Sequence, residues 1–258
     1  MTGTRASRAP AELLITLDVD WAPDHVIDAV AGQLAAAGVR ATWFITHASP
    51  AVERLRERGD LFELGIHPNF MPGSTHGATV DAVLAHCLAL VPEARVMRTH
   101  GLVSSSRLLD EVLARSEIRI DSSLLLRRHP NLGVVEQPFP HGVLARVPIW
   151  WEDDVEQLAV DPLWDVSAPG GGGLRVLNFH PVHVALNGAT AAPYAALKAA
   201  WPVLADAPAE AFTRHRATGD GPATAFTRAL ATLQAAAGGR TLGMLVPDTA
   251  PAPHPACA

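Results

Sequence analysis

Short apolar runs alternate with longer helix-like segments along the first half of the 258-residue chain. The run 13–17 is typical of a buried strand, and residues 24–38 follow it with a helical pattern that ends at a glycine. Strand-like runs at 40–46 and 61–66 continue the alternation. Strands that alternate with helices form βα units around a parallel sheet. This alternation predicts an α/β fold.

Later segments extend the same pattern to the end of the chain. We expect helices over 49–59, 78–91, 104–116, 191–201 and 223–239, strands over 94–98, 117–120, 142–150, 174–179 and 240–246, and a glycine-rich loop over 168–173. A count of roughly seven strands plus a terminal one favours a closed or nearly closed (β/α) barrel over an open sheet. No linker or repeat divides the chain, so we expect one domain over 1–258, with flexible tails at 1–11 and 248–258.

Composition excludes several classes of protein. Hydrophobic residues make up 48% and charged residues 18% of the chain, which argues against global disorder. The net charge of −6, without a cluster of basic residues, argues against a nucleic-acid-binding protein. Cys87 and Cys257 are too far apart in sequence for a zinc ribbon or a disulfide framework. Because no apolar run is typical of a secretory signal or a membrane span, we expect a cytoplasmic location.

Chemically active side chains follow almost every predicted strand. They are Asp18 and Asp20, His47, His67, Arg98 and His100, Asp121, the acidic run 152–154, and His180 with His183 close behind. Any one of these residues could be a helix cap or a surface side chain. The carboxyl ends of parallel barrel strands, however, meet at one mouth, where active sites lie. Their shared position therefore predicts an active site at the C-terminal strand ends.

The two aspartates of the segment LDVDW are two residues apart, so in a strand their side chains point the same way. Like charges that close repel each other. A bound cation would relieve the repulsion between Asp18 and Asp20. One aspartate and two histidines are a common ligand set for a divalent ion such as zinc, which can also lower the pKa of a bound water. One carboxylate would then bind metal while its neighbour accepts a proton.

The segment 16–180 resembles the NodB-homology polysaccharide deacetylases, carbohydrate esterases that remove N-acetyl groups from sugars. The resemblance rests on five motifs in order, TLDVDW, ELGIHPNF with GSTHG, MRTHG, IDSS with PIWWEDD, and LNFH. The phrases DVDW, GIHPNF and HG are most similar to the WbmS-like subgroup, which is found with O-antigen gene clusters. The resemblance implies a distorted (β/α) barrel with about seven parallel strands, which agrees with the strand count, and one divalent metal ion.

The resemblance also implies roles for individual residues. The general base would be Asp18, oriented by Arg98, the metal ligands Asp20, His67 and His76, and the general acid His180.

The third metal ligand is where the sequence departs from the family pattern. The usual two histidines are four residues apart, but Met71 stands four after His67. We expect His76 as the substitute, because a loop of Gly, Pro and Ser could fold it back. His47 and His100 are rival ligands.

Other polar and aromatic residues near the motifs are candidates for substrate binding. They are His47, His100, Trp150, Trp151 and Asp154. Trp150 or Trp151 could stack on a sugar ring, although a tryptophan more often packs in a core. An acid of the WEDD segment, Asp154 or Asp153, is expected to hold His180.

The sequence therefore predicts a metal-dependent amidohydrolase that removes an N-acetyl group from an amino sugar or from its nucleotide- or lipid-linked glycan precursor. One divalent ion is expected, Zn²⁺ first, with Co²⁺, Ni²⁺ and Mn²⁺ as alternatives. A second hypothesis is another metal-dependent C–N hydrolase on the same scaffold, such as a deformylase, an allantoinase-like hydrolase or a small-metabolite deacetylase. A third is a non-catalytic sugar- or metal-binding module, although metal binding alone requires neither Asp18 nor His180. The identity of the sugar and the oligomeric state are not predicted.

Overall fold

A nine-stranded sheet runs through the computed structural model, which describes residues 11–167 and 172–246. The strand order is β6-β7-β5-β4-β3-β2-β1-β9-β8. The strands are β1 Glu12–Asp18, β2 Ala41–Ile45, β3 Phe62–Ile66, β4 Val96–Met97, β5 Ile120–Asp121, β6 Val135–Phe139, β7 Gly142–Arg146, β8 Ile149–Glu152 and β9 Leu174–Phe179. Neighbouring strands are parallel except β6 and β7, which form an antiparallel hairpin. The α/β fold expected from the sequence is confirmed.

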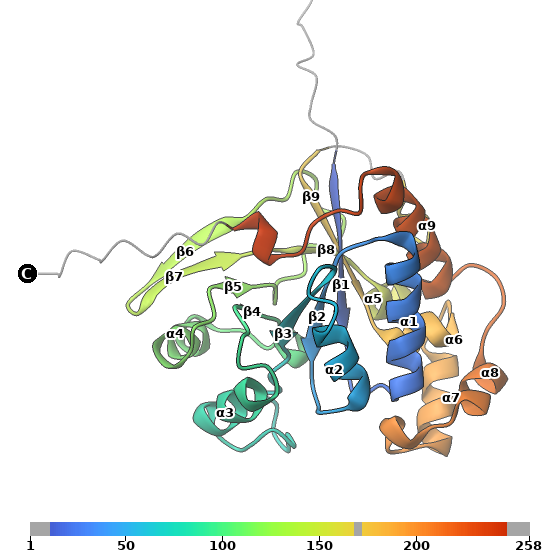
Figure 1. Cartoon of the computed structure of the whole chain (residues 1–258), viewed down its shortest axis with the longest axis horizontal. Helices are drawn as coiled ribbons and strands as arrows, with labels where there is room; N and C mark the ends of the chain where they lie inside the picture. Colours follow the sequence, from blue (N-terminus) through green and yellow to red (C-terminus); the bar gives the residue numbers. More distant parts are fainter. Residues whose placement is uncertain (1–10, 168–171, 247–258) are drawn as a thin grey trace, which may run out of the picture.

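Helices flank the sheet in two groups. They are α1 Asp24–Ala37, α2 Pro50–Arg56, α3 Val80–Leu90, α4 Ser106–Arg115, α5 Asp153–Leu158, α6 Pro181–Leu186, α7 Ala192–Ala200, α8 Ala209–His215 and α9 Pro222–Ala235, with short 3-10 turns at His100–Leu102, Leu204–Asp206 and Gly243–Leu245. Figure 1 shows α1, α6, α7, α8 and α9 together beside β1 and β9, while α3 and α4 lie toward the β6–β7 hairpin. None of the described helices is long and apolar enough to cross a lipid bilayer.

The central strands are covered on both faces, which explains their sequences. Strand β1 is buried from Leu13 through Asp18, and β9 is buried along its whole length. Parallel strands covered on both sides are nearly continuous apolar runs rather than alternating ones. Helix α1 contributes Val26, Ile27, Val30 and Leu34 to the same core, at the spacing of one helical face. The buried polar side chains of these strands therefore need hydrogen-bond partners within the protein.

Edge strand β8 contacts the segment that follows β5 without a continuous ladder. Among the described residues, β6 and β8 are the edge strands and do not pair with each other. An isolated parallel bridge joins Leu125, shortly after β5, to Ile149 of β8. The amide of Ile149 donates to the carbonyl of Leu124 at 2.8 Å, and the amide of Leu126 donates to the carbonyl of Ile149 at 2.9 Å. This contact curls the sheet back on itself, which agrees with a distorted barrel.

Two expected strands need correction. The predicted strand 142–150 is divided by Val147 and Pro148 into β7 and β8, which pair with different neighbours. The predicted strand 240–246 is wrong, because this segment contains only the 3-10 turn 243–245.

Side chains of the sheet explain the loss of the terminal strand. The hydroxyl of Thr42 accepts the amide of Leu242 at 3.0 Å, and the carboxylate of Glu63 accepts the amide of Gly243. The backbone donors of this segment are therefore satisfied by side chains, so that a strand ladder is not required.

The remaining differences between expected and observed elements concern three short helices, the helix ends and segments outside the described residues. Helices α5, α6 and α8 were not among the expected helices, and the other helix ends differ by a few residues. Most of the expected loop at 168–173 and most of both expected flexible tails fall outside the described residues, which include Gly172, Gly173 and Ala11 of these segments. The described residues share one sheet and one buried core, and the assignment of a single domain over 1–258 stays a prediction.

Candidate metal and catalytic site

The turn after β1 brings the two aspartates of LDVDW toward one histidine. Asp18 is the last residue of β1, and Asp20 and Trp21 have left-handed backbone angles, with φ of 43° and 55°. Non-glycine residues adopt this region at a cost, so two in succession indicate a turn held by its surroundings. Nε2 of His180 lies 3.8 Å from Oδ2 of Asp18 and 3.7 Å from Oδ2 of Asp20. The expected convergence of the two carboxylates is therefore present.

Asp18 is buried among partners that favour its ionised form. Oδ1 lies 3.0 Å from Nη1 of Arg98, and Oδ2 accepts the side-chain amide of Asn178 at 2.8 Å. Burial raises the pKa of Asp18, but the charge of Arg98 and of two nearby imidazoles outweighs it and holds the pKa below its ordinary value. Asp18 is thus a fixed, ionised carboxylate.

Arg98 is fully buried and is fixed by several acceptors besides Asp18. Nε donates to the carbonyl of Ser122 at 2.9 Å, Nη2 donates to the hydroxyl of Ser122 at 2.8 Å, and Nη1 donates to the hydroxyl of Thr16 at 2.9 Å. Nη1 also contacts the amide oxygen of Asn178, and the guanidinium lies 4.4 Å from the ring centre of Phe44. These contacts fix the guanidinium of Arg98 in one orientation. Its position beside Asp18 agrees with the expectation from the sequence.

Asp20, His67 and His100 form a compact cluster of nitrogen and oxygen donors. Oδ1 of Asp20 lies 3.2 Å from Nε2 of His67 and 3.2 Å from Nδ1 of His100, and these two nitrogens are 3.4 Å apart. Ligand bonds of about 2.0–2.1 Å in tetrahedral geometry require ligand atoms about 3.3 Å apart. The three atoms therefore already have the mutual spacing of one face of a tetrahedral divalent-metal site. The residues present fit the metal that the resemblance implies.

Electrostatics at the cluster agree with a cation site. Burial raises the pKa of Asp20, but hydrogen bonds from His100 and His67 lower it well below the ordinary value, so the carboxylate is ionised. When a metal is bound, the nearly buried carboxylate of Asp20 would supply one negative charge, and the imidazoles of His67 and His100 would supply two neutral nitrogen donors.

His76 lies apart from this cluster, with both ring nitrogens engaged elsewhere. Nε2 lies 3.0 Å from the carbonyl oxygen of Thr46, and Nδ1 accepts the backbone amide of Asn69 at 3.2 Å. The ring stacks on His86 with centres 4.7 Å apart and also packs against Trp21. The loop that we expected to fold His76 onto the metal instead uses it to tie residue 69 to the end of β2.

The two rival metal ligands, His100 and His47, lie in different surroundings. His100 is in the donor cluster described above. His47 is half-buried, with Nδ1 3.1 Å from the hydroxyl of Thr46, and belongs to none of the donor clusters among the described residues.

His180 lies close to Asp20 and is held in place by an acid of the WEDD segment. Nδ1 lies 2.7 Å from Oδ1 of Asp153, and the backbone amide of His180 donates to Oδ2 of the same carboxylate at 2.8 Å. Burial lowers the pKa of His180, but the charge and hydrogen bond of Asp153 more than offset it, so the pKa lies well above the ordinary value. Of the two acids we considered, Asp153 holds His180.

Asp154, unlike Asp153, does not form a hydrogen bond with His180 among the described residues. It is half-buried, and its Oδ1 is a buried atom with no hydrogen-bond partner among the described residues. Burial raises the pKa of its carboxyl group. Because it is an acceptor without a partner near His180, Asp154 remains a candidate for substrate binding.

The two tryptophans offered for sugar stacking are core residues. Trp151 has no exposed surface, donates from its indole nitrogen to the carbonyl of Leu163 at 2.7 Å and packs on Phe179. Trp150 is 5% exposed and packs under the guanidinium of Arg175. Neither ring presents a face to a ligand, so the expectation of sugar stacking is corrected for both.

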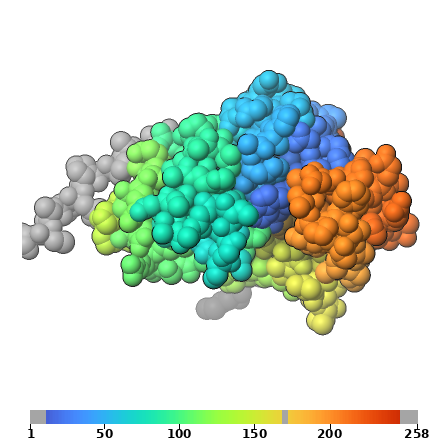
Figure 2. Space-filling view, turned by 90° about the horizontal axis from the view of Figure 1, so that it is seen from below, coloured from blue at the N-terminus to red at the C-terminus, as the bar shows by residue number. Residues whose placement is uncertain are grey.

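The donor cluster opens into a cavity of about 410 Å³. Its lining residues are Asp20, Trp21, Asn69, Gly73, Thr75, His100, Tyr194, Lys198, Pro202, Val203, Leu204 and Ala205. In Figure 2 the orange surface of the α7 region faces the teal and blue surfaces of the earlier segments across a hollow. The aromatic residues at this cavity are Trp21 and Tyr194, where we had expected Trp150 and Trp151.

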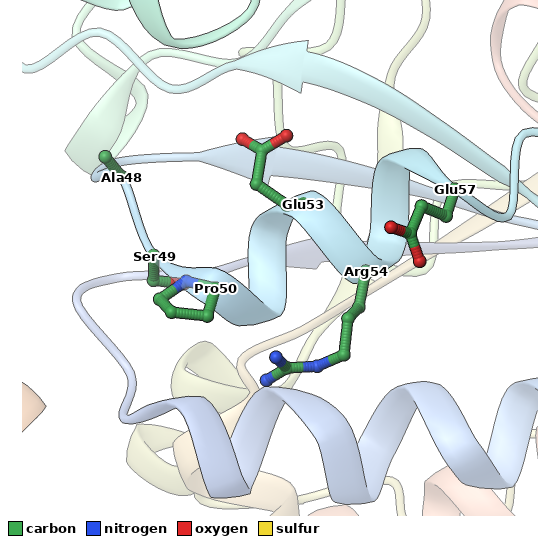
Figure 3. A pocket seen from close by; sticks show the side chains of 6 residues that line it. All are labelled: Ala48, Ser49, Pro50, Glu53, Arg54 and Glu57. Carbon is green, nitrogen blue, oxygen red and sulfur yellow. The ribbon is translucent and has the colours of Figure 1, made fainter.

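A second hollow lies at the start of α2 and has no comparable chemistry. It is lined by Ala48, Ser49, Pro50, Glu53, Arg54 and Glu57 (Figure 3). Arg54 extends toward α1, where it forms two hydrogen bonds with Asp28 at 2.7 and 2.9 Å. No histidine lines this hollow, so it lacks the nitrogen donors found at the first cavity.

The WbmS-like polysaccharide deacetylase family model matches residues 15–198, most of the chain and all the residues of the donor clusters. The chain belongs to this family. Membership of the WbmS-like polysaccharide deacetylases makes it a hydrolase of carbon–nitrogen bonds. None of the curated proteins matches it by sequence similarity.

One solved structure supports the family assignment. A protein of Bordetella bronchiseptica described as a polysaccharide deacetylase involved in O-antigen biosynthesis, WbmS, is 34% identical, with a TM-score of 0.73 over 85% of this chain and 89% of that one. A variant of the peptidoglycan deacetylase PdaC from Bacillus subtilis is 12% identical, with a TM-score of 0.42 over 92% of this chain and 90% of that one.

Sequence reasoning missed several residues of the site. Asn178 donates one amide group to both Asp18 and Glu152, each at 2.8 Å. Asn178 stands two residues before His180 in the LNFH motif, and that position in a strand, on the same face as the histidine, could have revealed it. Trp21 and Tyr194 gave no comparable signal, because their roles depend on the cavity wall.

Proposed function

We propose that this WbmS-like deacetylase is a metal-dependent amidohydrolase that removes an N-acetyl group from an amino sugar or from its nucleotide- or lipid-linked glycan precursor. The observation that carries the proposal is the position of His180, whose Nε2 lies 3.8 Å from Oδ2 of Asp18 and 3.7 Å from Oδ2 of Asp20. We also retain a cytoplasmic location in the proposal, since such precursors are made inside the cell.

We assign the metal ligands as Asp20, His67 and His100. The distances among their donor atoms support His100 over His76 as the third ligand, because His76 uses both ring nitrogens elsewhere. A divalent ion such as Zn²⁺ would polarise the amide carbonyl there and make water more acidic. The open side of the cluster faces the cavity, where a substrate amide can enter.

Asp18 is the general base of the proposed reaction. Its ionised carboxylate takes a proton from the water that attacks the acetamide carbon. Arg98 and Asn178 each bind one of its oxygens, so the base keeps one orientation and the remaining lone pairs face the cluster. The same buried contacts exclude bulk water from the base.

His180 is the general acid. Its protonated imidazole donates the Nε2 proton to the sugar nitrogen as the carbon–nitrogen bond breaks, so acetate and a free amine are the products. Asp153 fixes the ring from the other side and stabilises the imidazolium. Base and acid therefore carry opposite charges before the reaction, as hydrolysis requires.

Release of acetate from N-acetyl sugars tests this proposal. Purified protein freed of metal by a chelator should be inactive, and activity should return on addition of one equivalent of Zn²⁺ or Co²⁺. The Asp18→Asn variant should bind the same equivalent of metal without hydrolysing the sugar. Hydrolysis that survives complete metal removal would refute the proposal.

A further inference from the structure

The chain contains one lysine and one tyrosine, and both line the cavity above the donor cluster. Tyr194 and Lys198 are four residues apart on α7, so their side chains lie on the same face of the helix. Nζ of Lys198 lies 3.5 Å from the hydroxyl of Tyr194 and 5.7 Å from the centre of its ring. The other basic residues of the chain are arginines. A lysine at this one position supplies a compact point charge where a ligand would enter.

No carboxylate in the described part of the chain neutralises Lys198. Among the described residues its polar and cation–π contacts are both with Tyr194, whereas many of the arginines pair with acids. Among the residues that line the cavity, Asp20 is the sole carboxylate, and it is engaged with His67 and His100. Once a cation shares that carboxylate, the fixed charge left at the cavity wall is positive.

Tyr194, which contacts Lys198, is linked to His180 by two successive ring contacts. Its ring packs on His183 with centres 5.0 Å apart, and His183 packs edge-on against His180 at 5.2 Å. Trp21, on another part of the wall, packs edge-on against His100 at 5.4 Å. Both aromatic side chains are half-buried, so each can keep a contact with the protein while it faces a ligand.

We infer that the substrate is an acetamido sugar that carries an anionic group, a carboxylate or a phosphate, bound by Lys198 beside Tyr194. This inference rests on the proposed function, since it places the amide at the donor cluster. A carboxylate on the sugar ring and a phosphate of a carrier share this chemistry, because each offers anionic oxygens to an ammonium donor. In either case Lys198 is a specificity-determining residue that takes no part in breaking the amide bond.

Equilibrium binding of three small probes tests the inference without requiring turnover. The probes are the methyl glycoside of N-acetylglucosamine, N-acetylglucosamine 1-phosphate, and the uronic acid of the same 2-acetamido sugar. Each is titrated by calorimetry into zinc-loaded Asp18→Asn protein, alone and combined with Lys198→Met or Lys198→Arg. Arg214→Met is the matched control, because it removes one exposed charge from α8, which packs against α7.

We expect at least one anionic probe to bind about tenfold more tightly than the neutral glycoside. Lys198→Met should abolish that preference, Lys198→Arg should restore most of it, and Arg214→Met should leave it unchanged. A preference for the 1-phosphate indicates a carrier-linked substrate, and a preference for the uronic acid indicates an acidic sugar.

Equal affinity for all three probes, failure of every probe to bind, or a preference that persists in Lys198→Met would overturn the inference. Acetate release by the wild-type enzyme is measured in parallel on the same probes. Deacetylation of the neutral glycoside at an undiminished rate would leave the proposed function intact while the anionic subsite fails.

Discussion

The carboxylate of Asp153 holds His180 at two points, through the ring nitrogen Nδ1 at 2.7 Å and through the backbone amide at 2.8 Å. Asp153 begins α5 directly after β8, and His180 follows β9, the neighbouring parallel strand. The pairing of these two strands therefore sets the distance between acid and imidazole, and Nε2 is left facing Asp18 and Asp20.

The first prediction concerns the proton affinity of His180. The negative charge of Asp153 raises the pKa of His180 against the effect of burial, so Asp153→Asn should lower that pKa. The imidazolium would then be lost at a lower pH, and the alkaline limb of the pH–kcat profile should move to lower pH. A profile of acetate release from pH 5 to 10 measures this. An unchanged alkaline limb would mean that His180 is not the group that titrates there.

The second prediction separates the candidate metal ligands. His100→Ala removes one of three clustered donors and should reduce bound zinc from one equivalent to well below one. His76→Ala should keep near one equivalent, because its ring contacts Thr46 and the backbone of Asn69 and not the cluster. Metal content of chelator-stripped and reloaded protein gives the result. Met71→Ala, at an exposed side chain, is the control.

His76→Ala should instead reduce the free energy of unfolding. The substitution leaves the amide of Asn69 and the carbonyl of Thr46 without their side-chain partner, at a cost of about 1–3 kcal/mol for a buried group. Urea unfolding measures this difference. Retained stability together with lost zinc would reverse the roles assigned to His76 and His100.

The third prediction concerns the base. Asp18→Asn preserves the size of the side chain but removes the proton acceptor, and kcat should fall by about 10²–10⁴. Bound zinc should remain near one equivalent, because Asp18 is not in the donor cluster with His67 and His100. Parallel assays of acetate release and metal content check both halves. Loss of metal together with activity would instead make Asp18 a ligand.

The fourth prediction uses the buried carboxyl group of Glu152. Burial and the charge of Asp154 raise its pKa from 4.5 to about 8, so the folded protein holds a proton that the unfolded chain releases. The folded state binds more protons between these values, so this group makes the free energy of unfolding fall as pH rises from about 4.5 to about 8. Glu152→Gln is neutral at every pH and can still accept from Asn178.

The Tm of Glu152→Gln relative to wild type should therefore increase with pH across that window and level off above it. Thermal unfolding at a series of pH values measures the difference. Glu210→Gln, at an exposed position on α8, is the control and should not reproduce the slope. A constant difference between Glu152→Gln and wild type across the series would contradict the prediction.

Local sequence was sufficient for the central strands and for the end of the sheet that carries the site. The alternation of apolar runs and helical patterns predicted β1, β2, β3 and β9 closely, because buried parallel strands are continuous apolar segments. The residues at the strand ends include Asp18 of β1, Arg98 after β4 and His180 after β9, whose relationship depends on the order of parallel strands. Their convergence is a property of the fold class, so the chain order of the motifs revealed it.

The third metal ligand, the partner of His180 and the cavity wall were decided by tertiary structure. His76 lies in the loop between β3 and α3 and His100 follows β4, and only the paths of these two segments determine which ring reaches Asp20. The long-range capture of residues 242–243 by Thr42 and Glu63 likewise replaced an expected strand. Contacts between residues far apart in the chain leave no periodic signal in the sequence, since their geometry depends on how every intervening element packs.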